Sequence, residues 1–242
     1  MSSLPAAVLP DIGIRTSFQI VHELLLLGER LSAAKSPVAV LPIAPPAFEL
    51  FEHVGSARMS AEQFISRRFH ESFASRVEHF MPRLFTLRQQ NGDICGAFGL
   101  RSANRRLFLE QYLDTPIDQV IAARSGRATE RRSIVEVGHF SGAFPGSARA
   151  MIELLTEQLH REGVEWVAFT GTTALRNTFS RLGLAPIDIQ AATVDRLPEE
   201  ERAAWGSYYD NFPRVLVGNV GEGFRAMHHG VGSSPAVAGA LP

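Results

Sequence analysis

The sequence of residues 134–149 is IVEVGHFSGAFPGSAR, and its pattern is the main indication of the fold. The first seven residues form an apolar run suited to a buried strand, interrupted by the carboxylate of Glu136. Gly142, Pro145 and Gly146 then break the strand. Apolar residues next recur on one face of a helix, at Ala148, Met151, Ile152, Leu155 and Leu159. The pattern predicts a strand, a turn and a helix that crosses over to a parallel strand.

More elements are predicted on both sides of this unit. Upstream we expect strands over 48–54, 83–88, 94–100 and 107–112, and helices over 60–79 and 118–123. Asn91-Gly92-Asp93 joins two of the strands as a hairpin. Downstream we expect strands over 164–170 and 215–220 and a helix over 175–182. These elements predict an α/β (α+β) fold with a mixed, mostly antiparallel central sheet and helices on both faces.

Composition suggests three regions. Residues 1–46 are rich in Ala, Pro and Ser, with one helical candidate at 18–31, and are interpreted as an accessory arm. Residues 47–220 are expected to form the domain. Residues 221–242 are rich in Gly, Ala, Ser and Pro and are interpreted as a flexible tail.

Bulk properties exclude several function classes. The 242 residues carry a net charge of −1, which does not resemble the basic field of a nucleic-acid binder, so no DNA partner is expected. No apolar run approaches the roughly 20 residues of a membrane span, and no basic leader precedes an apolar segment, so a cytoplasmic protein is expected. The single cysteine, Cys95, has no metal-binding spacing around it, and no metal is expected. A P-loop, a dinucleotide fingerprint and a nucleophile elbow are absent from the sequence.

Two polar residues on the 134–140 strand are candidates for chemistry. Burial would raise the pKa of Glu136 and make it a usable general base near neutral pH. The alternative is a structural ion pair with Arg101 or Arg106. His139 is either a hydrogen-bonded structural histidine or a residue of the acyl and acceptor pocket.

The turn that follows is a candidate anion site. A glycine-containing turn that opens a helix leaves backbone N–H groups free to bind phosphate, and Arg149 in the first helical turn could add a cationic contact. The alternative is an ordinary strand–helix turn.

Other polar residues follow later strands. Thr170 and Thr172 are placed at the mouth of a cleft, at the end of the 164–170 strand. Tyr208 and Tyr209 either anchor a loop or supply a proton donor to a leaving thiolate. Asn177 lies on the next predicted helix, where a solvated side chain is the simpler interpretation.

Several motifs resemble the thermostable hemolysin family over residues 48–220. They are Leu107–Asp114 with Pro116-Ile117, Ile134–Gly138, Phe169–Thr172 with Leu175–Asn177, and Trp205–Tyr209 with Pro213. That family is in turn similar to the GCN5-related N-acetyltransferase (GNAT) fold, especially to acyl-homoserine-lactone synthases and N-acyl amino acid synthases.

The resemblance implies an acyltransferase, one that transfers groups other than aminoacyl groups. It would move an acyl group from a pantetheine thioester to an amine of a small molecule or amino acid. Acyl-CoA or an acyl carrier protein would be the co-substrate, with no permanently bound cofactor. Glu136 matches the strand carboxylate that often serves as base, and Asn177 matches a residue common on the later helix. Backbone amides near Val137 and Gly138 would hold the thioester carbonyl.

The donor arm would lie on the turn and first helical residues. By the resemblance these are Gly142, Gly146, Ser147, Ala148 and Arg149. The family's Gln/Arg-x-x-Gly-x-Gly/Ala loop is not intact here, which leaves room for a carrier-protein donor. Phe179 stands where such enzymes carry a tyrosine, so a proton donor would have to be Tyr208 or Tyr209.

Rival hypotheses are a membrane-active hemolysin, a non-catalytic acyl-thioester binder, and an aminoacyl-tRNA-dependent amide-forming transferase. Acyl length, acceptor identity and oligomeric state do not follow from the sequence.

Overall fold

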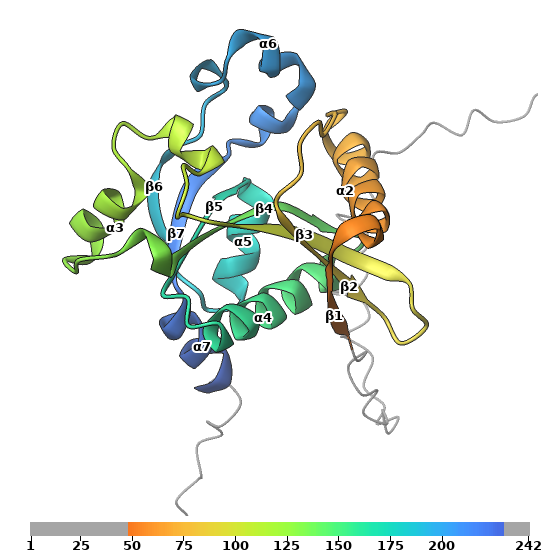
Figure 1. The fold of residues 1–242 in the computed structure, drawn as a ribbon, viewed down its shortest axis with the longest axis horizontal. Helices are drawn as coiled ribbons and strands as arrows, with labels where there is room; N and C mark the ends of the chain where they lie inside the picture. The colour runs from red at the N-terminus through yellow and green to blue at the C-terminus, as the bar shows by residue number, and fades with distance from the viewer. Residues whose placement is uncertain (1–47, 230–242) are drawn as a thin grey trace, which may run out of the picture. The chain divides into compact units, whose positions relative to one another are not determined.

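The computed structural model describes residues 48–229, and within them seven strands form one sheet in the order β1-β2-β3-β4-β5-β7-β6 (Figure 1). The strands are β1 Glu49–His53, β2 Arg83–Arg88, β3 Ile94–Ser102, β4 Ile134–Gly142, β5 Trp166–Gly171, β6 Ile187–Ala191 and β7 Arg214–Asn219. All neighbouring strands pair antiparallel except β4 and β5, which are joined by a helical crossover and pair in parallel. The predicted mixed sheet, with its parallel pair at the 134–149 unit, is confirmed.

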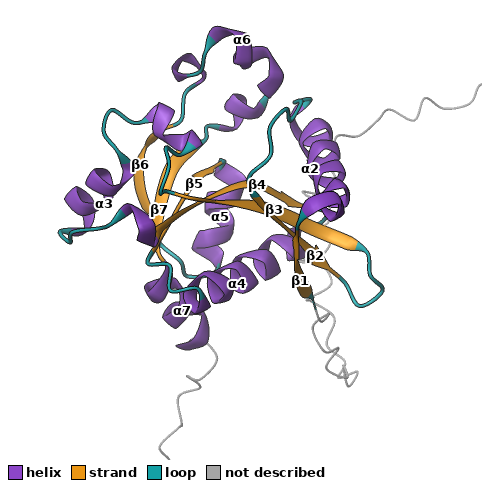
Figure 2. Cartoon of the chain, viewed as in Figure 1, coloured by secondary structure: helices purple, strands orange, loops and turns teal. Residues whose placement is uncertain are grey.

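Helices cover both faces of the sheet (Figure 2). They are α2 Arg58–Phe73, α3 Ile117–Ser125, α4 Pro145–Arg161, α5 Thr173–Arg181, α6 Glu199–Arg202 and α7 Val220–His229. Short 3-10 turns include η2 Phe108–Tyr112, η5 Ala203–Trp205 and η6 Tyr208–Asn211. None of the helices within 48–229 is long and apolar enough to cross a membrane.

The two faces follow from the alternation of side chains along each strand. On one face α4 buries Met151, Leu155 and Leu159 against residues of β3 and β4 such as Phe98. On the other face α2 packs on Leu84 and, further along, η2 and α3 pack on β4, β5 and β7. The cores thus lie on opposite sides of the sheet, and α7 lies beside α4 (Figure 1).

The prediction and the structure differ in three elements. Residues 108–112 are the 3-10 turn η2 rather than a strand, because the carboxylates of Glu136 and Glu110 accept its free backbone N–H groups. The helix predicted to reach residue 79 ends at Phe73, where Ala74 adopts a left-handed conformation with φ 52°. The strand β6 was not predicted from the sequence at all.

Part of the predicted C-terminal tail is helical. Residues 221–229 belong to the helix α7, which continues directly from β7. The remainder of that tail, the predicted accessory arm and the helix expected at 18–31 lie outside the described residues.

Candidate active site

A cavity of about 700 Å³ lies where β4 and β5 separate. The two strands pair at four positions, from Ile134 opposite Trp166 to Val137 opposite Phe169. Beyond these positions β4 remains paired with β3, and β5 remains paired with β7. Because each strand keeps its outer neighbour and loses the other, a gap opens inside the sheet.

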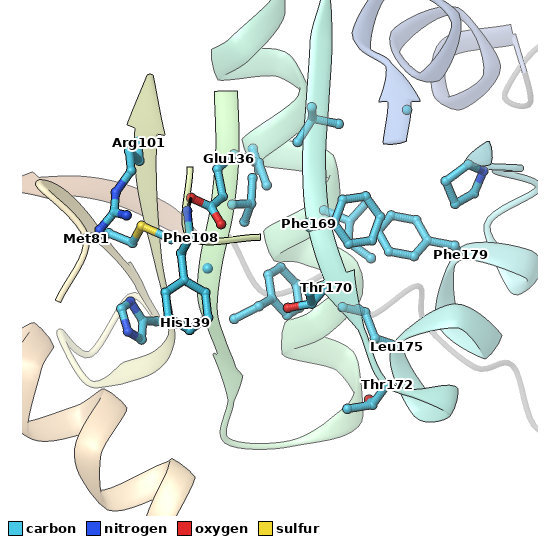
Figure 3. Close-up of a pocket in the computed structure, with 18 of the residues that line it drawn as sticks. Met81, Arg101, Phe108, Glu136, His139, Phe169, Thr170, Thr172, Leu175 and Phe179 are labelled. Carbon is cyan, nitrogen blue, oxygen red and sulfur yellow. Dashed lines mark hydrogen bonds between the residues drawn. The ribbon is translucent and has the colours of Figure 1, made fainter. Parts of the chain in front are cut away.

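The cavity reaches both faces of the sheet through this gap. Its lining includes Phe69 and Phe73 from α2, on one face, and Leu155 and Leu159 from α4, on the other. We call these two ends the α2 side and the α4 side. Figure 3 shows Arg101 and His139 on the β3–β4 edge of the gap, and Phe169 and Phe179 on the β5–α5 edge.

The α4 side is lined mainly by apolar side chains, with Thr156, Asn219 and Glu222 among its polar residues. Its lining includes Ile152, Leu155, Leu159, Val167, Phe169, Leu175, Phe179, Leu184, Val220 and Ala226. A space with such walls suits an aliphatic chain.

Glu136 lies on β4 at the α2 side and is 3% exposed. Its two carboxylate oxygens accept the backbone N–H groups of Leu109 at 2.8 Å and Phe108 at 3.0 Å. Burial raises the pKa of Glu136, although these N–H groups and the charge of Arg101 oppose the shift. No ion pair joins Glu136 to Arg101 or Arg106 among the described residues, so the predicted structural salt bridge is not formed.

His139 occupies a bulge in β4. Between Gly138 and Ser141 the register against β3 shifts, and His139 has φ 55°, a conformation that non-glycine residues adopt rarely. Its ring lies between Phe69 and Phe80, with centroids 6.1 and 5.6 Å away, and its Nδ1 has no hydrogen-bond partner among the described residues. Burial lowers the pKa of His139 to about 4, and the charge of Arg101 acts in the same direction. His139 is therefore neutral at pH 7.

Tyr208 belongs to the α2 side of the cavity. It packs on Phe69, Phe73 and Trp205, and its hydroxyl donates to Thr170 Oγ1 at 3.3 Å. Burial raises the pKa of Tyr208, so the phenol keeps its proton. The Tyr208 hydroxyl and Thr170 thus meet at the gap between the strands.

Tyr209 does not line the cavity. Its hydroxyl lies 2.6 Å from that of Tyr112, in the core between η2 and η6. The structure therefore supports an anchoring position for Tyr209.

The predicted donor loop lies at the start of α4, outside the cavity lining. Ser147 is fully buried, and its hydroxyl donates to the Phe144 carbonyl at 2.6 Å. The carbonyl of Gly142 accepts from Arg68 Nε at 3.0 Å, and exposed Arg149 pairs with Glu153. Gly146 and Ala148 complete the first turn of α4, which presents its N-terminal backbone at the end of β4.

The remaining predicted residues divide into two groups. Val137, Gly138 and Thr172 line the cavity, whereas Asn177 is exposed on α5 and does not. A Cβ at Gly138 would come within 2.4 Å of the terminal methyl group of Met81, so that flexible side chain would have to shift.

Sequence reasoning did not identify several cavity residues. Arg101 was considered as an ion-pair partner of Glu136, Phe69 and Phe73 only as part of the helix predicted over 60–79, and Phe108 only as part of the strand and motif predicted at 107–114. The four-residue spacing of Phe69 and Phe73 places them on one face of a helix, but such a stripe does not distinguish a core from a cavity wall.

Within residues 48–229 no cluster of three or more His, Cys, Asp or Glu side chains is arranged to hold a metal ion. The cavity lining supplies carboxylate, phenol, imidazole and guanidinium groups.

The model of the thermostable hemolysin family matches residues 52–224. The chain belongs to the thermostable hemolysin family. No curated protein sequence matches this hemolysin-family chain.

Several solved structures are similar to the chain at low sequence identity. FeeM, an N-acyl amino acid synthase from uncultured soil microbes, is 13% identical with a TM-score of 0.51, over 74% of this chain and 93% of FeeM. TofI, solved with an inhibitor and MTA, is 16% identical with a TM-score of 0.49, over 74% of this chain and 96% of TofI. The acyl-homoserine-lactone synthase LasI is 10% identical with a TM-score of 0.49, over 79% of this chain and all of LasI. Together with the strand order, the similarity to FeeM confirms the GNAT-like fold expected for this hemolysin-family chain.

Proposed function

We propose that the protein is an N-acyltransferase that moves an acyl group from a pantetheine thioester to the amine of a small molecule or amino acid. The observation that carries this proposal is a cavity that passes through the sheet beside a buried carboxylate. Such a passage lets a donor and an acceptor enter from different faces and meet in the gap between β4 and β5. The N-acyl amino acid synthase activity of FeeM, on the same fold, supports the same reaction class.

The donor would bind along β4 and α4. The N-terminal turn of α4 suits a phosphate of the pantetheine arm, because free N–H groups and the helix dipole favour an anion there. The thioester would lie at the bulge around Gly138, and the acyl chain would extend into the apolar α4 side. The donor is acyl-CoA or an acylated carrier protein.

The acceptor would bind on the α2 side, next to Glu136. Each carboxylate oxygen of Glu136 accepts one backbone N–H and retains a second lone pair, so the group can still take a proton from an amine, directly or through water. The amine nitrogen then attacks the thioester carbonyl carbon, and the carbon–sulfur bond breaks. The Tyr208 hydroxyl would donate a hydrogen bond to the departing sulfur.

The first experiment is mass spectrometry of the full chain with acyl-CoAs and, separately, with acylated carrier protein, in the presence of a pool of amines. We expect stoichiometric release of free thiol together with an acylated amine. Binding of the donor without thiol release from any amine would support a non-catalytic binder instead. Neither binding nor release, combined with leakage of liposomes, would support a membrane-active protein.

A further inference from the structure

Arg101 places a positive charge inside the cavity. It lies on β3 directly opposite Glu136 of β4, and both residues line the cavity on the α2 side (Figure 3). Directly opposed residues of neighbouring strands point to the same face of a sheet. A partly buried guanidinium in such a space is costly unless it has an anionic partner.

The residues around Arg101 do not supply that partner. Glu136, the nearest acid by register, directs its two oxygens to the backbone of Phe108 and Leu109 instead. Within residues 48–229 no carboxylate lies within 4.0 Å of Arg101, and no hydrogen bond engages its guanidinium. The planar guanidinium group of Arg101 can therefore donate its N–H groups to a molecule in the cavity.

The phosphate of the donor is too far away to be this partner. Arg101 pairs with Glu136, six residues before Gly142 at the end of β4, where α4 begins. At about 3.3 Å per residue, the separation along the strand is roughly 20 Å. The anion that Arg101 faces must therefore belong to the molecule on the α2 side.

The chemistry of a guanidinium favours a carboxylate on that molecule. Arginine binds carboxylates through two parallel N–H···O bonds, with both charge and geometry matched. Around it the α2 side carries the aromatic rings of Phe69, Phe73, Phe108 and Tyr208, which suit an apolar or aromatic side chain.

We propose that the acceptor amine is an α-amino acid whose carboxylate is held by Arg101. This inference rests on the proposed acyl transfer and narrows its acceptor class. The carboxylate would orient the α-amine toward Glu136, on the neighbouring strand, while the side chain lies among the aromatic rings.

The test compares phenylalanine with phenethylamine, which differ only by the carboxylate. With the donor identified by thiol release, we expect the wild-type kcat/KM to favour phenylalanine by at least about 10-fold. Arg101→Met should lower kcat/KM for phenylalanine by about 10- to 100-fold more than for phenethylamine, the range for a hydrogen bond to a charged group. Any change common to both amines reports the loss of the Arg101 charge near Glu136. Arg101→Lys should be intermediate because it keeps the charge and loses the fork. Arg105→Met removes an exposed arginine outside the cavity and is the matched control.

A binding measurement separates this inference from the proposed function. N-lauroyl-phenylalanine and N-lauroyl-phenethylamide, two product analogues, are titrated into wild type and Arg101→Met without any donor. We expect only the carboxylate-bearing analogue to bind more weakly to the variant. Thiol release without discrimination between the two amines would overturn the amino-acid assignment and leave acyl transfer standing. Arg101-dependent binding of the carboxylate analogue without thiol release from any amine would keep the carboxylate site and overturn acyl transfer.

Discussion

At the scale of single residues, Glu136 combines two tasks that are usually separate. It holds the backbone of η2 through two N–H groups, and it lines the cavity at the point where an amine would react. Glu110 provides a natural comparison. It also accepts two backbone N–H groups, from Leu107 and Ile117, but it pairs with Arg131 and does not line the cavity.

Glu136→Gln should lower kcat by about 100-fold or more, which is the usual contribution of a general base. The acidic limb of the pH–rate profile, set by the raised pKa of Glu136, should disappear. Some stability will also be lost, because the amide nitrogen of glutamine cannot accept an N–H. Glu110→Gln is the control, since it should lose stability without changing the turnover of the folded fraction. Equal turnover in wild type and Glu136→Gln would remove Glu136 from the mechanism.

His139 makes the stability of the fold depend on pH. Its pKa is about 4 in the folded chain and about 6.5 in an unfolded one. Between these pH values the unfolded state binds a proton and the folded state does not. Stability from this group is fully present above pH 6.5 and is lost as the pH falls toward 4. Between pH 7 and pH 5 the loss is on the order of 2 kcal/mol.

His139→Asn should reduce this loss, since asparagine tolerates a positive φ and does not titrate. Urea unfolding at pH 7 and pH 5 measures this loss of stability. His70→Asn, at an exposed histidine, is the control. An unchanged difference between the two pH values in His139→Asn would show that other groups carry the dependence.

At the scale of elements, a turn fixes one wall of the site. Gly206 joins η5 to η6 with φ 52°, and a side chain there would collide with the carbonyl oxygen of Phe73 at the end of α2. The next residue, Ser207, donates its backbone N–H to that same carbonyl at 2.8 Å. This contact brings Tyr208 against the α2 helix.

Gly206→Ala should therefore separate η6 from α2 and destabilise the fold. The added Cβ and the Phe73 carbonyl that it meets both belong to backbone that cannot easily move apart. We therefore expect the free energy of unfolding to fall by about 2–3 kcal/mol, which lowers Tm by at least ~4 °C. Gly92→Ala is the control, because that hairpin glycine also has a positive φ but meets nothing within 4 Å. Thermal unfolding compares the two, and equal losses would mean that backbone strain alone, without the steric collision, explains the effect.

At the scale of the whole molecule, three helices enclose the apolar end of the cavity. Gly223 of α7 lies near Thr156 of α4, and a Cβ at Gly223 would come within 3.6 Å of the threonine methyl group. Leu184, just after α5, is the other neighbour. The length of this space thus depends on how α4, α5 and α7 pack together.

Gly223→Val should shorten the space available to an acyl chain. We expect kcat/KM to fall about 10-fold or more for long-chain donors and to remain within about 2-fold for acetyl donors, since each excluded CH₂ is worth about 0.8 kcal/mol. Ala174→Val, at an exposed position on α5 away from the cavity, is the control. A uniform loss across all chain lengths would indicate that the substitution disturbs α7 rather than the chain's path.

Local sequence patterns determined much of the fold. The 134–149 stretch predicted β4, the turn and α4, and Asn91-Gly92-Asp93 predicted the β2–β3 hairpin, because both depend on side-chain period and turn chemistry within a few residues. The same patterns failed at 107–112, where an apolar run resembled a strand. The distant carboxylate of Glu136, together with the segment's own Glu110, holds that segment as a 3-10 turn.

The tertiary structure alone decided the cavity. Glu136 was recognisable in the sequence as an acid in an apolar strand, but Arg101, Phe69 and Tyr208 come from segments far apart in the chain. Whether an aromatic residue becomes core or cavity wall depends on where β4 and β5 stop pairing, and that is set by the packing of non-local neighbours. The sequence pattern predicts which side chains are buried. Which of the buried side chains line a cavity depends on how the strands and helices pack together.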